Sequence, residues 1–212
     1  MNTTYKGPTA RSTDVVVVGG GVIGLSIAWR AAAAGLTVHL FDEHPGGGAS
    51  WAAAGMLAPV TEAHFGEETL LALNLEAALR YPAFVAELEA LTGDDVGFRT
   101  SGTLTVARDA DDAAVIRDLR GFQSELGLDV QALTSRECRA IEPALSPRIR
   151  GGIFVEGDHS IDNRRLVAAL LHACERTGVH LVREPVIEIE APSDRIRSVA
   201  TPSSRVACRS VV

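Results

Sequence analysis

The sequence predicts an α/β fold built on a parallel sheet, and three consecutive features near its N-terminus support this prediction. Val15–Val18 is a continuous β-branched run, as is typical of a parallel strand covered on both faces. Residues 22–34 are rich in alanine and favour a helix, and Gly35 is placed to end it. Leu36–Phe41 then forms a second apolar run. Strand, helix and strand in this order are the repeating unit of parallel sheets.

A glycine-rich turn joins the first strand to the helix. Gly19, Gly21 and Gly24 have the spacing GxGxxG, in which the glycines make the turn, admit a pyrophosphate against the backbone and let helix and strand approach closely. The free amides of the following helix favour an anion. Asp42 lies about 20 residues beyond, where an acid accepts hydrogen bonds from a ribose, and Glu43 is the reserve candidate. These features together predict a dinucleotide site and disfavour NADP, with a purely structural turn as the alternative.

The segment after the second strand separates the possible dinucleotides. Residues 46–56 are mostly glycine and alanine, and such small side chains let a long ligand lie against the backbone. Ser50, within this segment, has a hydroxyl that can bind a phosphate. The alternative interpretation is a flexible loop joined to a short alanine helix.

At this point the chain resembles the D-amino-acid-oxidase-type family of FAD-dependent oxidoreductases, in particular the glycine oxidases of the thiamine pathway. Two stretches carry the resemblance: VVVVGGGVIGLSIAWRAAAAGLTVHLFDE, residues 15–43, and GASWAAAGMLAPVTEA, residues 48–63. The resemblance implies a Rossmann-like FAD-binding domain with part of an α+β substrate domain, C-terminally truncated because family members are considerably longer. The expected domains are residues 1–57 with 160–212 for FAD, and residues 58–159 for a partial substrate or cap domain.

The resemblance also implies which residues contact FAD, in five groups along the cofactor. Gly19, Gly21, Val22, Ile23 and Gly24 would lie at the pyrophosphate turn, and Asp42 and Glu43 at the ribose. Ala49 and Ser50 would contact the phosphates, and Ala54, Gly55 and Met56 the flavin ring. Val186, in an expected strand Pro185–Ile189, would contact the adenine. The family more often has glutamate at position 42. The shorter Asp42 can still accept both ribose hydroxyls.

The activity implied by the resemblance is oxidation of a small amine or amino acid. Hydride would pass from the substrate α-carbon to the flavin, and oxygen would reoxidise the flavin and give hydrogen peroxide. The substrate-binding arginine of the family lies beyond Val212, so we assign no catalytic residue and expect a truncated, inactive half of an enzyme that can form a homo-oligomer at full length. An NAD-linked dehydrogenase fragment and a non-catalytic nucleotide-binding fragment are the alternatives.

Further elements are predicted along the rest of the chain. Residues 67–91 read as two helices separated at Tyr81-Pro82, because proline interrupts a helix. Thr134 and Glu137 form a capping box at the start of another helix. The other expected elements are strands at 103–107, 152–156, 179–182 and 206–212, and helices at 109–126 and from a cap at Asp162 or Asn163 to Thr177.

Composition excludes several classes of partner. A formal net charge of -7 and a pI near 5.4 argue against nucleic acid. The cysteines and histidines show neither a disulfide framework nor metal-ligand spacing, so no metal is expected: Cys138, Cys174 and Cys208; His44, His64 and His159. No secretory signal and no run of roughly 20 apolar residues is present, so we expect a cytoplasmic protein without a membrane segment.

Overall fold

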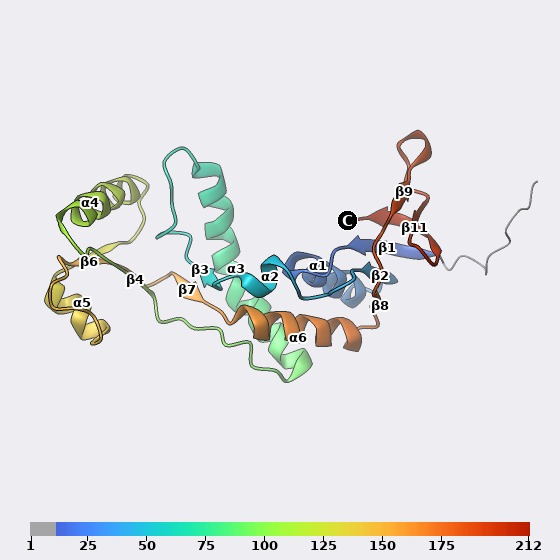
Figure 1. Ribbon diagram of the computed structural model, residues 1–212, viewed down its shortest axis with the longest axis horizontal. Coiled ribbons are helices and arrows are strands. Elements are labelled where there is room, and N and C mark those ends of the chain that lie inside the picture. The colour runs from blue at the N-terminus through green and yellow to red at the C-terminus, as the bar shows by residue number, and fades with distance from the viewer. Residues whose placement is uncertain (1–11) are drawn as a thin grey trace, which may run out of the picture. The chain divides into compact units, whose positions relative to one another are not determined.

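The computed structural model describes residues 12–212 (Figure 1). These residues form two compact units. Unit 1 contains the chain up to Ala54, residues 87–96 and residues 163–212, and unit 2 contains residues 55–86 and 97–162. The division falls near the two boundaries expected from the sequence, and residues 87–96 join the first unit as well. The assignment of one unit to FAD and the other to substrate stays a prediction.

Unit 1 is built on a six-stranded sheet with the order β8-β2-β1-β11-β10-β9. The strands β8, β2, β1 and β11 are parallel, whereas β10 is antiparallel to both β11 and β9. The fold class predicted from the sequence, α/β with a parallel sheet, is therefore confirmed. The elements of this unit are β1 Thr13–Val18, α1 Val22–Ala33, β2 Val38–Phe41, α2 Ala49–Ala52, α6 Asn163–Arg176, β8 His180–Val182, β9 Glu188–Glu190, the 3-10 turn Pro192–Asp194, β10 Ser198–Ala200 and β11 Arg205–Val211.

The helices of unit 1 form because their apolar residues recur at helical spacing and bury one face. Helix α1 packs against β1, β2 and α6. In α6 the buried residues recur at positions i, i+4 and i+7, which places them on one stripe. The buried side chains of the two helices are Leu25, Ala28 and Trp29 in α1, and Leu166, Val167, Ala169, Leu170, Ala173 and Cys174 in α6. This contact holds the N-terminal half of unit 1 to its C-terminal half.

Three helix ends are capped by a glycine or by side-chain hydrogen bonds. After α1, Gly35 adopts a φ of +87°, and its amide donates to the carbonyl of Ala32 as the helix closes. The side chain of Asp109 caps α4 by accepting from the amides of Asp111 and Asp112. The capping box of Thr134 and Glu137 is present at the start of α5. The end of α1 at Gly35 and the start of α5 therefore follow the local signals predicted from the sequence.

Unit 2 combines a three-stranded antiparallel sheet, order β4-β6-β5, with a two-stranded pair, β3-β7. A cluster of Ala63, Leu71 and Phe122 packs α3 against α4, and the ring of Phe65 lies 4.0 Å from that of Phe122. The elements of this unit are β3 Met56–Leu57, α3 Glu68–Thr92, β4 Thr103–Val106, α4 Ala110–Glu125, β5 Gln131–Leu133, α5 Ser135–Ile141, β6 Gly152–Val155 and β7 His159–Ser160, with the last turns of α3 belonging to unit 1.

Two sequence-based expectations for these elements were wrong. Residues 68–92 form one helix, α3, with Pro82 inside it, because apolar side chains on both sides of the proline, such as Leu71 and Val85, are buried. The strand expected at 185–189 is instead Glu188–Glu190, so Val186 precedes it. Helix α6 starts at Asn163, whose side chain donates to the backbone of α2, and Asp162, the other residue expected to cap it, directly precedes the helix. In the described part of the chain, no helix is both long and apolar enough to cross a membrane.

A buried carboxylate fixes the loop that follows β3 in unit 2. Asp158 is fully buried, and its oxygens accept hydrogen bonds from the amides of Val60 at 3.1 Å and Thr61 at 2.7 Å, and from the Thr61 hydroxyl. The amide of Gln123, also fully buried, donates to the carbonyl of Val60 at 2.7 Å. The loop at 60–61 is thus held by two side chains from distant parts of the sequence.

We expect Asp158→Asn to destabilise the protein by about 2 kcal/mol, because the amide nitrogen replaces an acceptor facing buried donors. The change is measured as a shift in the urea unfolding midpoint at constant slope. Asp129→Asn is the matched control, since Asp129 is exposed, and it should change stability by less than about 0.5 kcal/mol. Equal stability of the two variants would contradict the role given to Asp158.

Candidate functional site

A hollow lies at the N-terminus of α1, between the carboxyl end of β1 and the short helix α2. We call it the α1 hollow. Its lining is almost entirely backbone and small apolar side chains, and all of it belongs to unit 1: Val17, Val18, Gly19, Gly21, Val22, Ile23, Gly24, Ile27, Ala49, Ser50, Ala53 and Val212. Seven of the residues predicted to contact a cofactor are brought together here, namely Gly19, Gly21, Val22, Ile23, Gly24, Ala49 and Ser50.

The three motif glycines have distinct structural reasons to be glycine. A Cβ atom on Gly24 would overlap the carbonyl oxygen of Gly19, so only glycine lets α1 approach β1 this closely. Gly19 itself adopts a φ of +106°, a conformation that other residues rarely take. A Cβ on Gly21 would meet only the Ser50 hydroxyl, at 3.1 Å, so the fold leaves room there that a ligand can use. This geometry fits a dinucleotide phosphate cradle.

The amides at the start of α1 are available to an anion. The amide of Val22 donates to Ser50 Oγ at 2.9 Å. Within residues 12–212, no acceptor lies in hydrogen-bonding position for the amides of Ile23 and Gly24. The first turn also contains no acidic side chain. The positive end of the helix dipole therefore opens into the α1 hollow without a counter-charge from these residues.

Asn163 holds the segment that carries Ser50. Its side-chain amide donates to the carbonyls of Ser50 at 2.7 Å and Trp51 at 3.0 Å, across 113 residues of sequence. The guanidinium of Arg164 lies 4.5 Å from the centre of the Trp51 ring. The start of α6 thus fixes α2, and α2 in turn fixes the hydroxyl at the start of α1. Sequence reasoning missed this role of Asn163, because no local pattern marks a contact between such distant residues.

A second hollow, the Asp42 hollow, adjoins the first and shares Val18 and Gly19 with it. It is lined by Val18, Gly19, Phe41, Asp42, Glu43, His44, Gly47, Gly48, Pro185 and Val186. The carboxylate of Asp42 accepts from the amides of Gly20 and His44, each at 2.6 Å. These bonds orient the carboxylate, and its oxygens keep further lone pairs for a ligand hydroxyl. The predicted residues Asp42, Glu43 and Val186 are therefore neighbours in space.

Three predicted cofactor residues are not placed in either hollow. Ala54 is exposed at the end of the first segment of unit 1. Gly55 and Met56 belong to unit 2, where the Gly55 carbonyl accepts from the amide of Ile161 and Met56 starts β3. Their proximity to a flavin ring stays a prediction.

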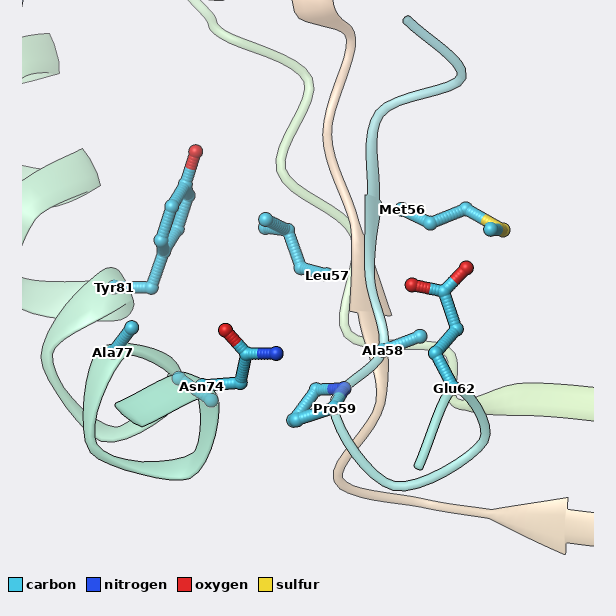
Figure 2. Close-up of a pocket in the computed structure, with 9 residues that line it drawn as sticks. Met56, Leu57, Ala58, Pro59, Glu62, Asn74, Ala77 and Tyr81 are labelled. Carbon is cyan, nitrogen blue, oxygen red and sulfur yellow. The ribbon is translucent and has the colours of Figure 1, made fainter. Parts of the chain in front are cut away.

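Unit 2 contains a pocket of its own, with a volume of about 220 Å³. It is formed by the segment from β3 into the following loop and by one side of α3: Met56, Leu57, Ala58, Pro59, Glu62, Asn74, Ala77, Ala78 and Tyr81. Figure 2 shows Asn74 and Ala77 on α3 facing Pro59 and Leu57 across the pocket. Burial raises the pKa of Tyr81 to about 12, so its phenol is neutral at physiological pH.

The described part of the chain contains neither a metal-binding group nor a reactive thiolate. Among the side chains that the structure describes, no group of three or more histidine, cysteine, aspartate or glutamate residues could hold a metal ion. All three cysteines are buried and unbridged, and burial raises the pKa of the Cys174 thiol to about 11. A thiol with so high a pKa is a poor nucleophile.

Comparison with known proteins identifies the family that shares this sequence. The family model for FAD dependent oxidoreductases matches residues 14–212. Glycine oxidase from Geobacillus kaustophilus is 34% identical over 170 residues, covering 79% of this chain and 45% of that protein. The 4-methylaminobutanoate oxidase (formaldehyde-forming) of Paenarthrobacter nicotinovorans is 30% identical over 215 residues, covering 99% of this chain and 25% of that protein.

A solved structure shows the same fold. The crystal structure of glycine oxidase from Geobacillus kaustophilus superposes with a TM-score of 0.88 at 32% identity, covering 96% of this chain and 55% of that one. The chain thus spans about half the length of this glycine oxidase.

The bonds of Asn163 lead to a prediction for cofactor affinity. Asn163→Ala is expected to raise the dissociation constant for FAD about tenfold, because two hydrogen bonds that hold α2 are lost. Fluorescence titration with FAD measures the constant, and hydrogen exchange at residues 49–52 should become faster without any ligand.

Asn163→Asp is the sharper variant, since it keeps the size and replaces the donor by a charge facing two carbonyls. It should weaken FAD binding at least as much as the alanine variant. Gln131→Ala, which removes an exposed amide in unit 2, should leave both measurements unchanged. Full FAD affinity in Asn163→Asp would show that these hydrogen bonds do not position the site.

Proposed function

The chain belongs to the family of FAD-dependent oxidoreductases, and on that premise we propose that it supplies the dinucleotide-binding part of an enzyme that oxidises a small amine or amino acid, with oxygen as electron acceptor. One observation carries the proposal. The α1 hollow and the Asp42 hollow adjoin, so free helix amides and an oriented carboxylate line one continuous stretch of surface. A diphosphate and the ribose next to it need these two groups in this order.

In this proposal each segment of unit 1 has a separate part in binding. The amides of Ile23 and Gly24, with the Ser50 hydroxyl, hold the diphosphate. Asp42 accepts hydrogen bonds from the adenosine ribose, with Glu43 beside it. The segment at Pro185 and Val186 borders the adenine. Ala54, Gly55 and Met56 line the path toward the flavin ring.

When bound, FAD accepts the two electrons released from the carbon–nitrogen unit of the substrate. The protein has to hold the substrate carbon against the ring, keep its amine neutral for the reaction and exclude competing reactions. Oxidation converts the amine to an imine, and water hydrolyses the imine to a carbonyl compound and a free amine. Oxygen takes up the two electrons with two protons and leaves as hydrogen peroxide.

The names of the relatives support an amine substrate. Glycine oxidase and 4-methylaminobutanoate oxidase differ in the size of the compound named, and both names denote compounds with an amino nitrogen. The family match favours FAD over NAD, which was the alternative at the level of the sequence.

The test uses the complete enzyme to which this chain contributes the dinucleotide-binding part, purified, supplied with FAD and freed of excess cofactor. We expect a visible flavin spectrum that bleaches anaerobically with glycine, N-methylglycine or 4-methylaminobutanoate, and that recovers in air with release of one peroxide per amine oxidised. Bound flavin that no amine reduces would overturn the proposed substrate class. Reduction of NAD in place of flavin would overturn the cofactor assignment.

A pair of glycine variants tests whether the α1 hollow is responsible. Gly21→Ala adds a methyl group where a phosphate is expected to lie, while in the free protein it meets only Ser50. We expect this variant to fold and to lose at least about tenfold in FAD affinity. Gly121→Ala is the control, since a Cβ at this position in α4 meets nothing within 4 Å. Equal affinity of the two variants for FAD would refute the role of the hollow.

A further inference from the structure

We propose that Met56 is a redox-sensitive modification site, at which hydrogen peroxide converts the thioether to a sulfoxide and thereby slows the enzyme. The inference rests on the proposed function for the source of the peroxide, which amine oxidation releases. It adds a modification that neither cofactor binding nor the oxidation of substrate requires. The evidence lies in the exposure of Met56, in the burial of the cysteines and in the surroundings of the Met56 side chain.

Met56 presents an accessible sulfur atom. It is the first residue of β3, and it is 54% exposed. The other methionine of the chain, Met1, lies outside the described residues. A thioether reacts with peroxide through a lone pair of its sulfur and needs no deprotonation, so access from solvent decides how fast it is oxidised. Met56 meets this condition.

The cysteines are protected from the same oxidant. Cys138, Cys174 and Cys208 are 0%, 4% and 7% exposed. Burial also raises the pKa of each thiol, that of Cys174 to about 11. The thiolate is the form that reacts with peroxide, and it is scarce when the pKa is raised. Among the described residues, Met56 therefore carries the sulfur atom that peroxide oxidises first.

The step transfers one oxygen atom to sulfur. A lone pair of the sulfur attacks one oxygen of hydrogen peroxide, and the oxygen–oxygen bond breaks. The proton on the attacked oxygen passes to the departing oxygen, which leaves as water. The sulfur loses an electron pair, the peroxide gains it, and methionine becomes methionine sulfoxide. The step therefore needs only the peroxide that amine oxidation releases.

The fold tolerates the added oxygen. The backbone is held around this position, because Met56 pairs with Ser160 of β7 and the carbonyl of Gly55 accepts from the amide of Ile161 at 2.8 Å. The Met56 side chain lies outside the buried core. Changes of exposed side chains usually alter stability little. The oxidised protein therefore stays folded, and the effect of oxidation is local.

The surroundings of Met56 decide what oxidation changes. Figure 2 shows the Glu62 carboxylate pointing toward the Met56 side chain. A sulfoxide oxygen and a carboxylate are both hydrogen-bond acceptors with negative charge, so they repel each other. The loop backbone is held in place, because the amide of Glu62 donates to the carbonyl of Ala58 at 3.1 Å. Oxidation therefore reorients the Met56 side chain.

Reorientation of Met56 slows catalysis without weakening cofactor binding. Met56 belongs to the segment expected to approach the flavin ring. The α1 hollow and the Asp42 hollow contain neither Met56 nor Glu62 in their linings. Oxidation should therefore lower the maximal rate and leave the dissociation constant for FAD unchanged.

The experiment uses the complete enzyme with FAD. One sample receives hydrogen peroxide without amine, and a second turns over an amine with or without catalase. Peptide mass spectrometry locates added oxygen. We expect one oxygen atom on the Met56 peptide in both samples, none on the cysteine peptides, and protection by catalase during turnover. The maximal rate should fall at least about threefold, and methionine sulfoxide reductases should restore it.

Two variants assign the loss of rate to one sulfur atom, with each rate compared with that protein's own starting value. Met56→Leu keeps an apolar side chain of similar size without sulfur, so peroxide should no longer lower its rate. Cys138→Ala is the matched control, since it removes a buried sulfur atom, and it should lose rate in peroxide as the parent does. Circular dichroism confirms that each variant is folded.

Oxidation at Met56, with a loss of rate that Met56→Leu escapes, supports the proposal. An unmodified Met56, oxidation of a cysteine before Met56, or an equal loss of rate in the parent and Met56→Leu would overturn it. The sample treated with peroxide needs no amine, so its peptide result is independent of the proposed function. It can fail while amine-dependent flavin reduction succeeds, and it can succeed while that reduction fails.

Discussion

The close approach of α1 to the end of β1 is the constraint on which the candidate site depends. It exists because Gly24 has no side chain, so the carbonyl of Gly19 can lie where a Cβ atom would otherwise be. The first amides of α1 therefore lie close to the carboxyl end of β1. The α1 hollow lies at these amides, and the Ser50 hydroxyl accepts a hydrogen bond from the first of them, that of Val22. A larger residue at position 24 would move the helix and with it the anion site.

The second requirement is that a loop from elsewhere in the chain closes around this helix end. Ser50 satisfies one amide of α1, and Asn163 fixes Ser50 through the backbone of α2. The carboxylate of Asp42 binds the amides of Gly20 and His44, which fixes the neighbouring turn. These bonds organise the site in the absence of any ligand, so less conformational entropy is lost when a ligand binds.

The charge at the start of α1 comes from the backbone alone. The open end of the helix dipole, without an acidic residue in its first turn, favours an anion. Among the described residues, the lining of the α1 hollow contains no charged side chain that would change this preference.

The sequence by itself determined what depends on neighbouring residues. The strand, glycine turn, helix and strand at residues 13–41 and the capping box at Thr134 follow from local sterics and local hydrogen bonds. The family resemblance came from residues 15–43 together with residues 48–63. Only the tertiary structure decided that α3 runs through Pro82, that Val186 lies before its strand and that Asn163 holds Ser50. The physical reason is that burial of side chains on both sides of a proline, and hydrogen bonds across 113 residues, depend on contacts that exist only once the chain has folded.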